Sequence, residues 1–522
     1  MQAPAIRIAR RKSWRVIVVD GNPEASGRDS GDHFECVDLK DRDGLLAIAR
    51  GHAERTGLDG VFTAGTDFSS SVAWVAEKMG LPGISFAAAM RATDKCLMRT
   101  AFAAAGVPSP NFCCWTGDGD PRSVHAVGLH FPLVVKPVDN MGARGVRRVD
   151  DDAELADACR AALPLSRSAR VIVEQFMEGR ELSLDAIVHD GRVTVCGVAD
   201  RHICFPPSFV EMGHTIPSEL DPGTLEDIER VFAAGIRAIG IDNGAAKGDI
   251  KLTARGPMVG EIAARLSGGY MSGWTFPLSS GVEVTEAALN IAVGLPPGDL
   301  SPRLRRTCAE RALISIPGIV ADILGVEDAR QLAGVEHVFL RIAPGDEVLF
   351  PSNNVQKCGS VIAAGEGRAE AVAAAERAIQ ALCVRLRPDT EKTTRFIFRE
   401  TGNNAYPSMD SGTLRSIRAL PPFRGDPIAA AADGPLAVEM PDGFDRQEAP
   451  DWHGMPMRDA VRHALARGGG APARARAVQS FTLSGLFWRA IVRGGAQGGT
   501  YLLESVRQAA ARGTLREFLA GT

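Results

Sequence analysis

Two carboxylates in a predicted β-hairpin stand out as residues that could bind a metal ion. Residues 247–265 have the alternation of two strands, and a turn centred on Arg255 places Asp249 opposite Glu261. The other face of the hairpin is then apolar and carries Ile250, Leu252, Met258 and Ile262. Like charges that face each other across two strands repel, so a cation should neutralise them.

Two kinds of cation fit this hairpin. Mg²⁺ often binds through one or two carboxylates together with substrate phosphates, which favours a metal site. A positively charged side chain of the hairpin would serve equally well, and three are available, namely Lys247, Lys251 and Arg265. Both carboxylates could also simply be solvated, and spacing leaves all of these interpretations open.

Two other segments have residue types that suit a nucleotide. The apolar run 131–137 contains Lys136 near its end, and a turn with Gly142, Ala143, Arg144 and Gly145 follows. A lysine and the backbone N–H groups of such a turn can bind phosphate oxygens. A surface hairpin with an exposed lysine would have the same pattern.

Further along, Glu174 and Glu181 flank a break between two strands. They could receive the amino group and hydroxyls of a nucleotide, or could lie in a solvated acidic turn.

The elements that position these residues follow from the hydrophobic pattern. Residues 15–95 alternate β-branched runs with helical stretches, which predicts a small open α/β sheet with strands at 15–20, 60–63 and 82–85. After residue 92 the order is mixed, with helices expected at 224–240, 282–294 and 368–386. Beyond residue 390, helices are expected near 457–467 and 501–519. The fold class is therefore α/β in the first part and α+β in the second.

Composition narrows the class of protein. The 522 residues include 59 Lys and Arg against 63 Asp and Glu, a formal net charge of −4, which disfavours nucleic-acid binding. No apolar run approaches the ~18 residues of a membrane span, and no secretion signal is evident, so a cytoplasmic protein with no membrane partner is expected. The ten cysteines form no C-x-x-C motif and are predicted to be reduced core residues.

The order and spacing of these motifs resemble the ATP-grasp superfamily, the ATP-dependent carboxylate–amine ligases. The resemblance runs from residue 15 to about residue 390. The segments that carry it are Asp20-Gly21-Asn22-Pro23, Thr93-Asp94-Lys95, Val134-Val135-Lys136-Pro137, Glu174-x-Phe176-x-x-Gly179-x-Glu181 and Glu261-x-x-x-Arg265-Leu266-Ser267-Gly268-Gly269.

The resemblance implies an ATP-grasp fold in four parts. These are an N-terminal open α/β domain at 1–91, an ATP-grasp domain at 92–300, its C-terminal subdomain at 301–390 and an appended module of unknown function at 391–522.

The resemblance also implies roles for individual residues. Lys95 and Lys136 would hold ATP phosphates under the loop 142–145, while Glu174, the Phe176 backbone and Glu181 would hold adenine and ribose. Asp249 and Glu261 would bind Mg²⁺, with Mn²⁺ as an alternative ion. Arg265 would stabilise the charge of an acyl phosphate and of the tetrahedral intermediate.

Three departures from the family pattern stand out. The family's metal motif is usually Glu-x-Asn, whereas Ala263 stands two residues after Glu261. Asp249 occupies a position where glutamate is more usual. The first family strand is also missing, because residues 1–6 already look like the first helix, and we expect an exposed sheet edge there.

The predicted function is an ATP-dependent ligase that activates a small carboxylate, such as an amino acid, as an acyl phosphate. An amine then displaces the phosphate of this acyl phosphate, so that the reaction releases ADP and phosphate. His214 is a candidate to orient the substrate or act as a base, although an ordinary loop histidine fits equally well. Two alternatives stay open, namely biotin-carboxylase-like activity and a catalytically impaired ATP-binding regulatory protein. A homodimer is an expectation from the resemblance only.

Overall fold

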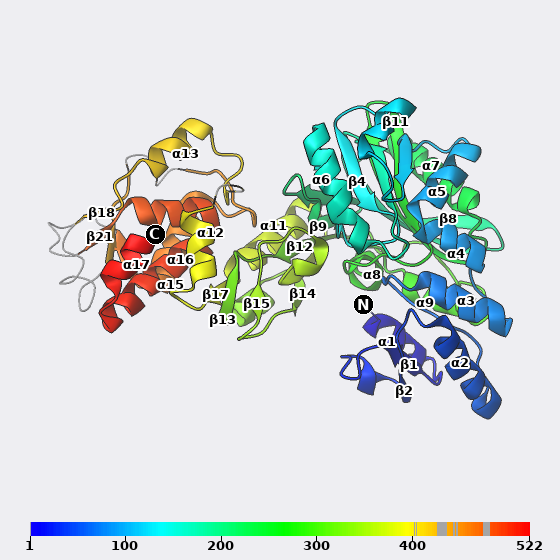
Figure 1. Cartoon of the computed structure of the whole chain (residues 1–522). Coiled ribbons are helices and arrows are strands. Elements are labelled where there is room, and N and C mark those ends of the chain that lie inside the picture. Colours follow the sequence, from blue (N-terminus) through cyan, green and yellow to red (C-terminus); the bar gives the residue numbers. More distant parts are fainter. Residues whose placement is uncertain are drawn as a thin grey trace. The chain divides into compact units, whose positions relative to one another are not determined.

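The computed structural model describes residues 2–400, 402, 404–424, 436–441, 444, 447–472 and 481–522 (Figure 1). It divides into two compact units. Unit 1 comprises Met1–Glu310 and Ala364–Ala371, and unit 2 comprises Arg311–Ala363 and Val372–Thr522. The predicted division into four domains stays a prediction, and part of the predicted appended module lies outside the described residues.

Unit 1 begins with helix α1 (Ala3–Arg11) and a two-stranded parallel sheet of β1 (Ile17–Asp20) and β2 (His33–Cys36). The connection between β1 and β2 contains the short helix η1 (Arg28–Ser30). The helices α2 (Arg42–Thr56), α3 (Ser69–Met79) and α4 (Phe86–Thr93) follow β2.

Two strands predicted in this region are wrong, because residues 60–63 and 82–85 form no strand. Gly60 lies tightly against the carbonyl of Ala292, and the Ser85 hydroxyl accepts the Ala88 N–H as the cap of α4. Local packing and capping therefore replaced the expected ladder.

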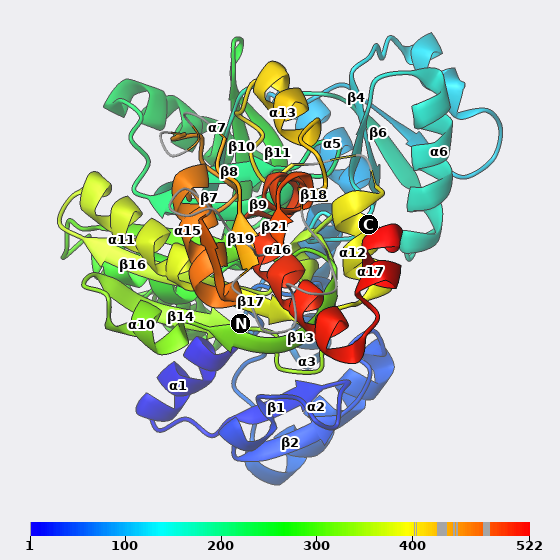
Figure 2. The same cartoon turned by 90° about the vertical axis from the view of Figure 1, so that its left-hand side faces the viewer.

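A four-stranded antiparallel sheet of unit 1 carries the predicted phosphate lysine. Its order is β3 (Phe112–Trp115), β6 (Val171–Gln175), β4 (Leu133–Pro137) and β5 (Arg147–Val149). Figure 2 shows α6 (Asp152–Ala162) beside β4 and β6, where its apolar side packs on the sheet. The short helices η2 (Pro121–Val127) and η3 (Leu163–Leu165) flank α6, and α5 (Lys95–Ala104) precedes the sheet in the chain.

A second antiparallel sheet of unit 1 carries the two carboxylates. The part of this sheet that lies within residues 180–263 has the strand order β11 (Gly256–Ala263), β10 (Gly244–Thr253), β7 (Arg180–His189), β8 (Arg192–Cys204) and β9 (Val210–Ile216). Helix α7 (Pro222–Ile239) covers the apolar face, where Phe232 and Ile236 share a core with Leu184 and Ile250. Because side chains alternate along a strand, the neighbouring residues of β10 point to the opposite, polar face.

Helix α7 confirms the prediction for 224–240, and α9 (Val284–Ala292) confirms the prediction for 282–294. A π-helical turn, η4 (Met271–Thr275), and α8 (Phe276–Ser280) precede α9. Strand β12 (Thr307–Leu313) crosses the boundary between the units.

Unit 2 contains a sheet in the order β15 (Glu347–Val348), β13 (Gly318–Leu324) and β17 (Cys383–Leu386), and an antiparallel pair of β14 (Val335–Leu340) and β16 (Gly359–Gly365). Helices α10 (Val326–Gln331), η5 (Asn354–Gln356) and α11 (Arg368–Ala381) accompany them. The helix predicted at 368–386 ends at Ala381, because the apolar residues after it join β17.

The rest of unit 2 is mostly helical around a small sheet in the order β18 (Phe423–Arg424), β21 (Thr482–Leu483), β19 (Leu436–Val438) and β20 (Gly470–Pro472). The helices are α12 (Glu391–Phe398), α13 (Ser411–Arg418), α15 (Met457–Gly468), α16 (Gly485–Arg512) and α17 (Leu515–Gly521). Trp488 of α16 and Val384 of β17 belong to one hydrophobic core, so residues on both sides of position 390 stabilise the same unit.

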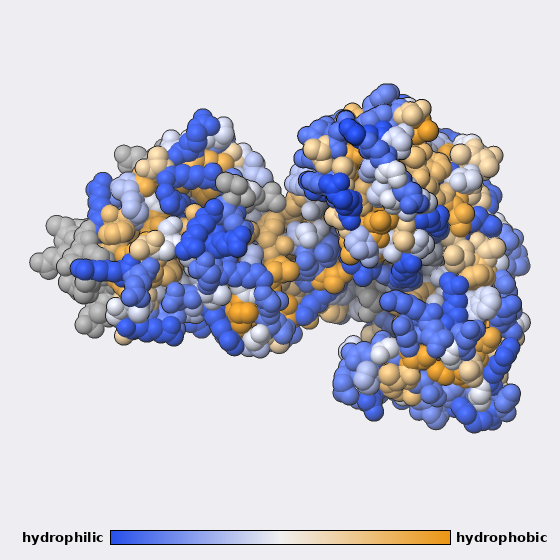
Figure 3. Space-filling model, in the orientation of Figure 1, coloured by the Kyte–Doolittle hydropathy of each residue, from blue (hydrophilic) through white to orange (hydrophobic). Residues whose placement is uncertain are grey.

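Hydrophilic residues are spread over the face seen in Figure 3. Among the described helices, none is both long and apolar enough to cross a membrane. The prediction that all ten cysteines are reduced is wrong, because Cys96 of α5 and Cys114 of β3 form a disulfide. Their separation of 18 residues hid a proximity that only the packing of α5 on β3 creates.

Candidate active site

The hairpin of β10 and β11 places the two candidate metal ligands face to face. Asp249 pairs with Glu261, which confirms the predicted register at this point. The turn, however, is tighter than expected, since Thr253 pairs with Gly256. A bulge restores the predicted pairing, because the register shifts between Asp249 and Ile250 and leaves Gly260 unpaired in β11.

The observed register also differs from the predicted apolar face of the hairpin. Ile250 pairs with Val259, which is fully buried, whereas Met258 pairs with Lys251 on the polar side. Met258 was expected on the apolar face because the prediction assumed a regular hairpin. Without the extra residue, Glu261 would also point away from Asp249, since a one-residue slip reverses every side chain.

A buried arginine holds this bulge in place. Arg99 of α5, 1% exposed, donates from Nη2 to the Gly260 carbonyl at 2.6 Å and from Nε to Oε1 of Glu174 at 2.8 Å. Glu174 in turn accepts a hydrogen bond from Lys136 Nζ at 2.6 Å through Oε2. One continuous set of contacts therefore connects the lysine of β4 to the bulge that orients Glu261.

Glu174 is thus a charged group enclosed by two cations. Burial raises its pKa, but Arg99 and Lys136 outweigh burial and lower the pKa below its ordinary value, so the carboxylate stays ionised. Its predicted contact with adenine stays a prediction.

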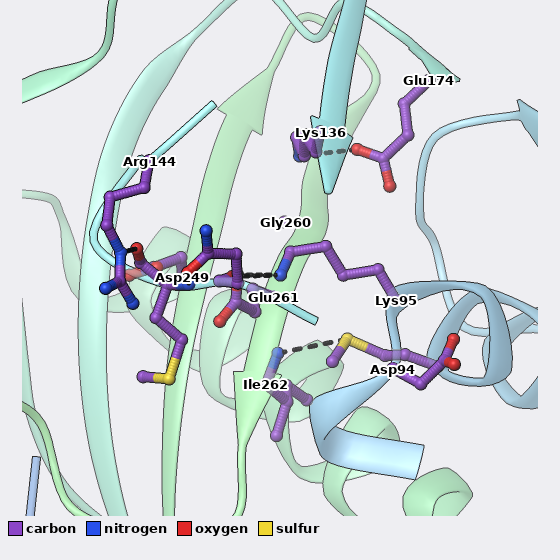
Figure 4. Close-up of polar contacts among 12 residues, drawn as sticks. Asp94, Lys95, Lys136, Arg144, Glu174, Asp249, Gly260, Glu261 and Ile262 are labelled. Carbon is purple, nitrogen blue, oxygen red and sulfur yellow. Dashed lines mark hydrogen bonds and ion pairs between the residues drawn. The ribbon is translucent and has the colours of Figure 1, made fainter. Parts of the chain in front are cut away.

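The two candidate phosphate lysines lie on the same side of the hairpin (Figure 4). Lys95, the first residue of α5, donates from Nζ to the Asn140 carbonyl at 2.9 Å and lies 3.6 Å from Oε2 of Glu261. Figure 4 also shows Lys136 meeting Glu174 above the hairpin. Both ammonium groups therefore lie where they could bind an anion near the two carboxylates.

The cations around Glu261 change its pKa. Burial raises its pKa, but Lys95, Lys247, Arg265 and Lys136 together outweigh burial and lower the pKa to about 2. Glu261 is therefore an ionised carboxylate at neutral pH, as a metal ligand must be.

The predicted phosphate loop follows β4. Gly142, Ala143 and Gly145 all have positive φ angles of 68°, 60° and 74°, so the turn needs residues that tolerate the left-handed region. A side chain at Gly145 would also collide with Leu165 and Pro137. Arg144 extends from this loop to form an ion pair with Asp67.

A cavity of about 380 Å³ lies beside the polar face of the second sheet. Phe176 and Phe209 line it with ring centroids 6.3 Å apart, and Arg148 and Lys251 lie over the Phe176 ring at 4.8 and 4.7 Å. Glu181 also lines it and binds Lys251 at 3.0 Å. The volume and the two rings suit a planar heterocycle.

The Phe176 N–H donates to the Pro132 carbonyl at 3.1 Å. The predicted backbone contact between Phe176 and adenine stays a prediction, as does the role of Glu181 at the ribose.

Arg265 follows β11 and is buried. It donates to the Leu266 carbonyl at 2.8 Å, and burial lowers its pKa, although Glu261, Asp249, Asp185 and Asp67 act in the opposite direction.

The next residues are anchored by Asp185, which is fully buried and accepts hydrogen bonds from the Ser267 N–H and the Ser272 hydroxyl, both at 2.8 Å. Burial raises the pKa of Asp185. The Gly268–Gly269 turn is therefore held firmly beside Arg265.

His214 of β9 lies in a second polar cluster. Its Nε2 is 2.7 Å from the Thr275 hydroxyl, and its Nδ1 is 3.8 Å from Glu211 and 3.6 Å from Glu310. One ligand atom from each of Glu211, His214 and Glu310 lies within 4.8 Å of the others. Sequence analysis missed Glu310, because it comes from β12, almost a hundred positions further along the chain.

Arg201 connects this cluster with the hairpin. Its guanidinium lies 2.8 Å from Asp249, 2.8 Å from Glu211 and 3.6 Å from Glu181. Burial lowers its pKa, but these three carboxylates outweigh burial and raise it. No spacing rule in the sequence connects Arg201 or Arg99 with the hairpin, whereas the single glycine before Glu261 is a recognised sign of a bulge.

Comparison with known proteins supports the resemblance to ATP-grasp ligases. The ATP-grasp domain family matches residues 129–273, and the family described as L-amino acid ligase C-terminal domain 2 matches residues 311–387. The crystal structure of L-amino acid ligase from Bacillus licheniformis is 24% identical, covers 73% of this chain and 95% of that chain, and has a TM-score of 0.65.

Two curated sequences extend the comparison. An uncharacterized protein of Sinorhizobium fredii is 27% identical over 72% of this chain and 79% of its own length. Carnosine synthase 1 of Homo sapiens is 28% identical over 60% of this chain but only 40% of its own length. Residues 129–273 therefore belong to the ATP-grasp domain family, the domain that ATP-grasp ligases share. Enzymes of this class form C–N bonds and use ATP and Mg²⁺.

Proposed function

We propose that this chain activates the carboxylate of an amino acid as an acyl phosphate and joins it to an amine, releasing ADP and phosphate. The observation that carries the proposal is the Asp249–Glu261 pair with Lys95, Lys136 and Arg265 around it. This arrangement offers both hard oxygen ligands and anion-binding groups in one place.

The fit of a metal ion can be judged from the donors. Asp249 and Glu261 are opposed carboxylates, and Glu261 is ionised, so they suit one hard cation such as Mg²⁺. When bound, Mg²⁺ offsets negative charge on the phosphates during phosphoryl transfer.

The reaction follows from the groups that surround the hairpin. Lys95 and Lys136 hold the phosphate chain, and a substrate carboxylate oxygen attacks the γ-phosphorus so that ADP leaves. Arg265 stabilises the negative charge of the acyl phosphate. The amine nitrogen then attacks the acyl carbon, phosphate leaves and the amide forms. The loop 142–145 excludes water from the acyl phosphate, which would otherwise hydrolyse.

The second polar cluster supports an amino acid as the substrate. Glu211 and Glu310 place two carboxylates beside His214, and negative charge there attracts an ammonium group. His214 is the residue that we assign to receive a proton from the attacking amine, because an imidazole nitrogen can accept a proton and this one lies beside Glu211 and Glu310. A homodimer stays a prediction from the family resemblance.

The test measures ADP and phosphate release from Mg²⁺–ATP across pairs of amino acids and amines, with AMP followed in the same samples. Release of ADP that requires both substrates, with an amide product in equal amount, supports the proposal. AMP and pyrophosphate would contradict the acyl-phosphate mechanism. Release that depends on bicarbonate would favour the biotin-carboxylase-like alternative, and ATP binding without turnover would favour a regulatory protein.

A further inference from the structure

Lys247 of β10 stands directly across from Ala263 of β11, the position where the family resemblance leads one to expect a metal-binding asparagine. Lys247 and Asp249 are two residues apart on the same strand and therefore share the polar face with Glu261. The small side chain of Ala263 leaves this part of the face to the lysine.

The lysine uses that space to reach the carboxylates. Its Nζ forms an ion pair with Oδ2 of Asp249, and its side chain is only 13% exposed. The other oxygen of Asp249 lies 2.8 Å from the guanidinium of Arg201. Each oxygen of Asp249 thus has one side-chain cation beside it.

This arrangement affects how many metal ions the site can hold. Two-metal sites clamp a reacting phosphate between two cations, and each ion needs its own ligands. An ammonium group has three donors and no acceptor, so Lys247 cannot act as a ligand, and Ala263 offers none. Positive charge at Lys247 also repels a second divalent ion, and it does so strongly in a partly buried site.

We propose that Lys247 takes the place of a second metal ion, so that this chain binds its nucleotide with a single divalent cation held by Glu261 and Asp249. The ammonium group then supplies fixed positive charge beside the phosphates. This inference rests on the proposed function, because it concerns the same nucleotide site.

The test counts bound Mn²⁺ by electron paramagnetic resonance, with the full chain and the non-hydrolysable β,γ-imido analogue of ATP. We expect one Mn²⁺ per chain with the nucleotide. The double variant Lys247→Gln with Ala263→Asn removes the ammonium and adds an amide oxygen, and it should bind two. Arg255→Gln changes an exposed cation at the tip of the same hairpin and should still bind one.

The possible failures can be told apart. Two Mn²⁺ per wild-type chain, with the analogue bound, would overturn this inference and leave the proposed function intact. A second Mn²⁺ gained by Ala263→Asn alone would also overturn it, because Lys247 would then not exclude the ion. If a separate titration detected no binding of the analogue, both the inference and the proposed function would fail. The wild-type count does not depend on whether the variants fold.

Discussion

Replacing Arg99 by methionine should both destabilise unit 1 and disturb the hairpin of β10 and β11. The substitution keeps an unbranched apolar side chain in α5 but removes the guanidinium that binds Glu174 and the Gly260 carbonyl. Glu174 is then left in a buried site, where it cannot exchange the lost contact for water, and the carbonyl of the half-buried Gly260 loses its donor.

The size of the stability loss depends on the contacts that Glu174 keeps. Removing one partner of a buried ion pair costs about 3–5 kcal/mol, because it leaves an uncompensated charge. Glu174 keeps Lys136 at 2.6 Å, which favours the lower end of that range. A loss of about 3 kcal/mol corresponds to roughly a hundredfold change in the folding equilibrium. Release of the Gly260 carbonyl should in addition weaken the bulge, and hence the opposition of Glu261 to Asp249.

Urea unfolding measures the stability loss, and hydrogen exchange with mass spectrometry places it at β6 and β11. Glu174→Gln added to Arg99→Met should recover part of the loss, because the buried charge is then gone. Arg255→Met, an exposed arginine of the same hairpin, is the matched control and should change stability by less than about 0.5 kcal/mol. A loss below about 1 kcal/mol for Arg99→Met, or no recovery in the double variant, would refute this reasoning.

Three further predictions concern the same site. Because the folded-state pKa of Glu261 is about 2 and its ordinary value is 4.5, its ionised form stabilises the fold above pH 4.5, and this contribution is lost as the pH falls toward 2. The difference in urea midpoint between wild type and Glu261→Gln should therefore shrink across that interval, and a constant difference would contradict it. Lys136→Ala and Glu261→Ala should each abolish substrate-dependent ADP release while the circular dichroism spectrum stays unchanged; normal turnover in both would show that the site is misassigned. Asp67→Asn removes the charged partner of Arg144, so hydrogen exchange in residues 141–146 should accelerate, whereas unchanged exchange would mean that the ion pair does not restrain the loop.

The amino-acid sequence determined the local pieces of this protein. The alternation of apolar and polar residues in 247–265 predicted a hairpin with Asp249 facing Glu261, because side-chain direction in a strand has a period of two. The helical spacing of apolar residues likewise predicted α7 and α9 from local sequence. Motif order along the chain was enough to predict the ATP-grasp fold, with ATP as the nucleotide.

Only the tertiary structure decided which distant groups share the site. Arg99, Arg201 and Glu310 reach their partners from separate helices and strands, and no spacing rule connects residues 99 and 260 or 214 and 310. The tight turn moved Met258 to the polar side, and the bulge at Gly260 then returned Glu261 to the face of Asp249, since a shift of one residue reverses the faces. The lowered pKa of Glu261 likewise comes from four cations on different elements, because charge interactions depend on distance in space and not on distance along the chain.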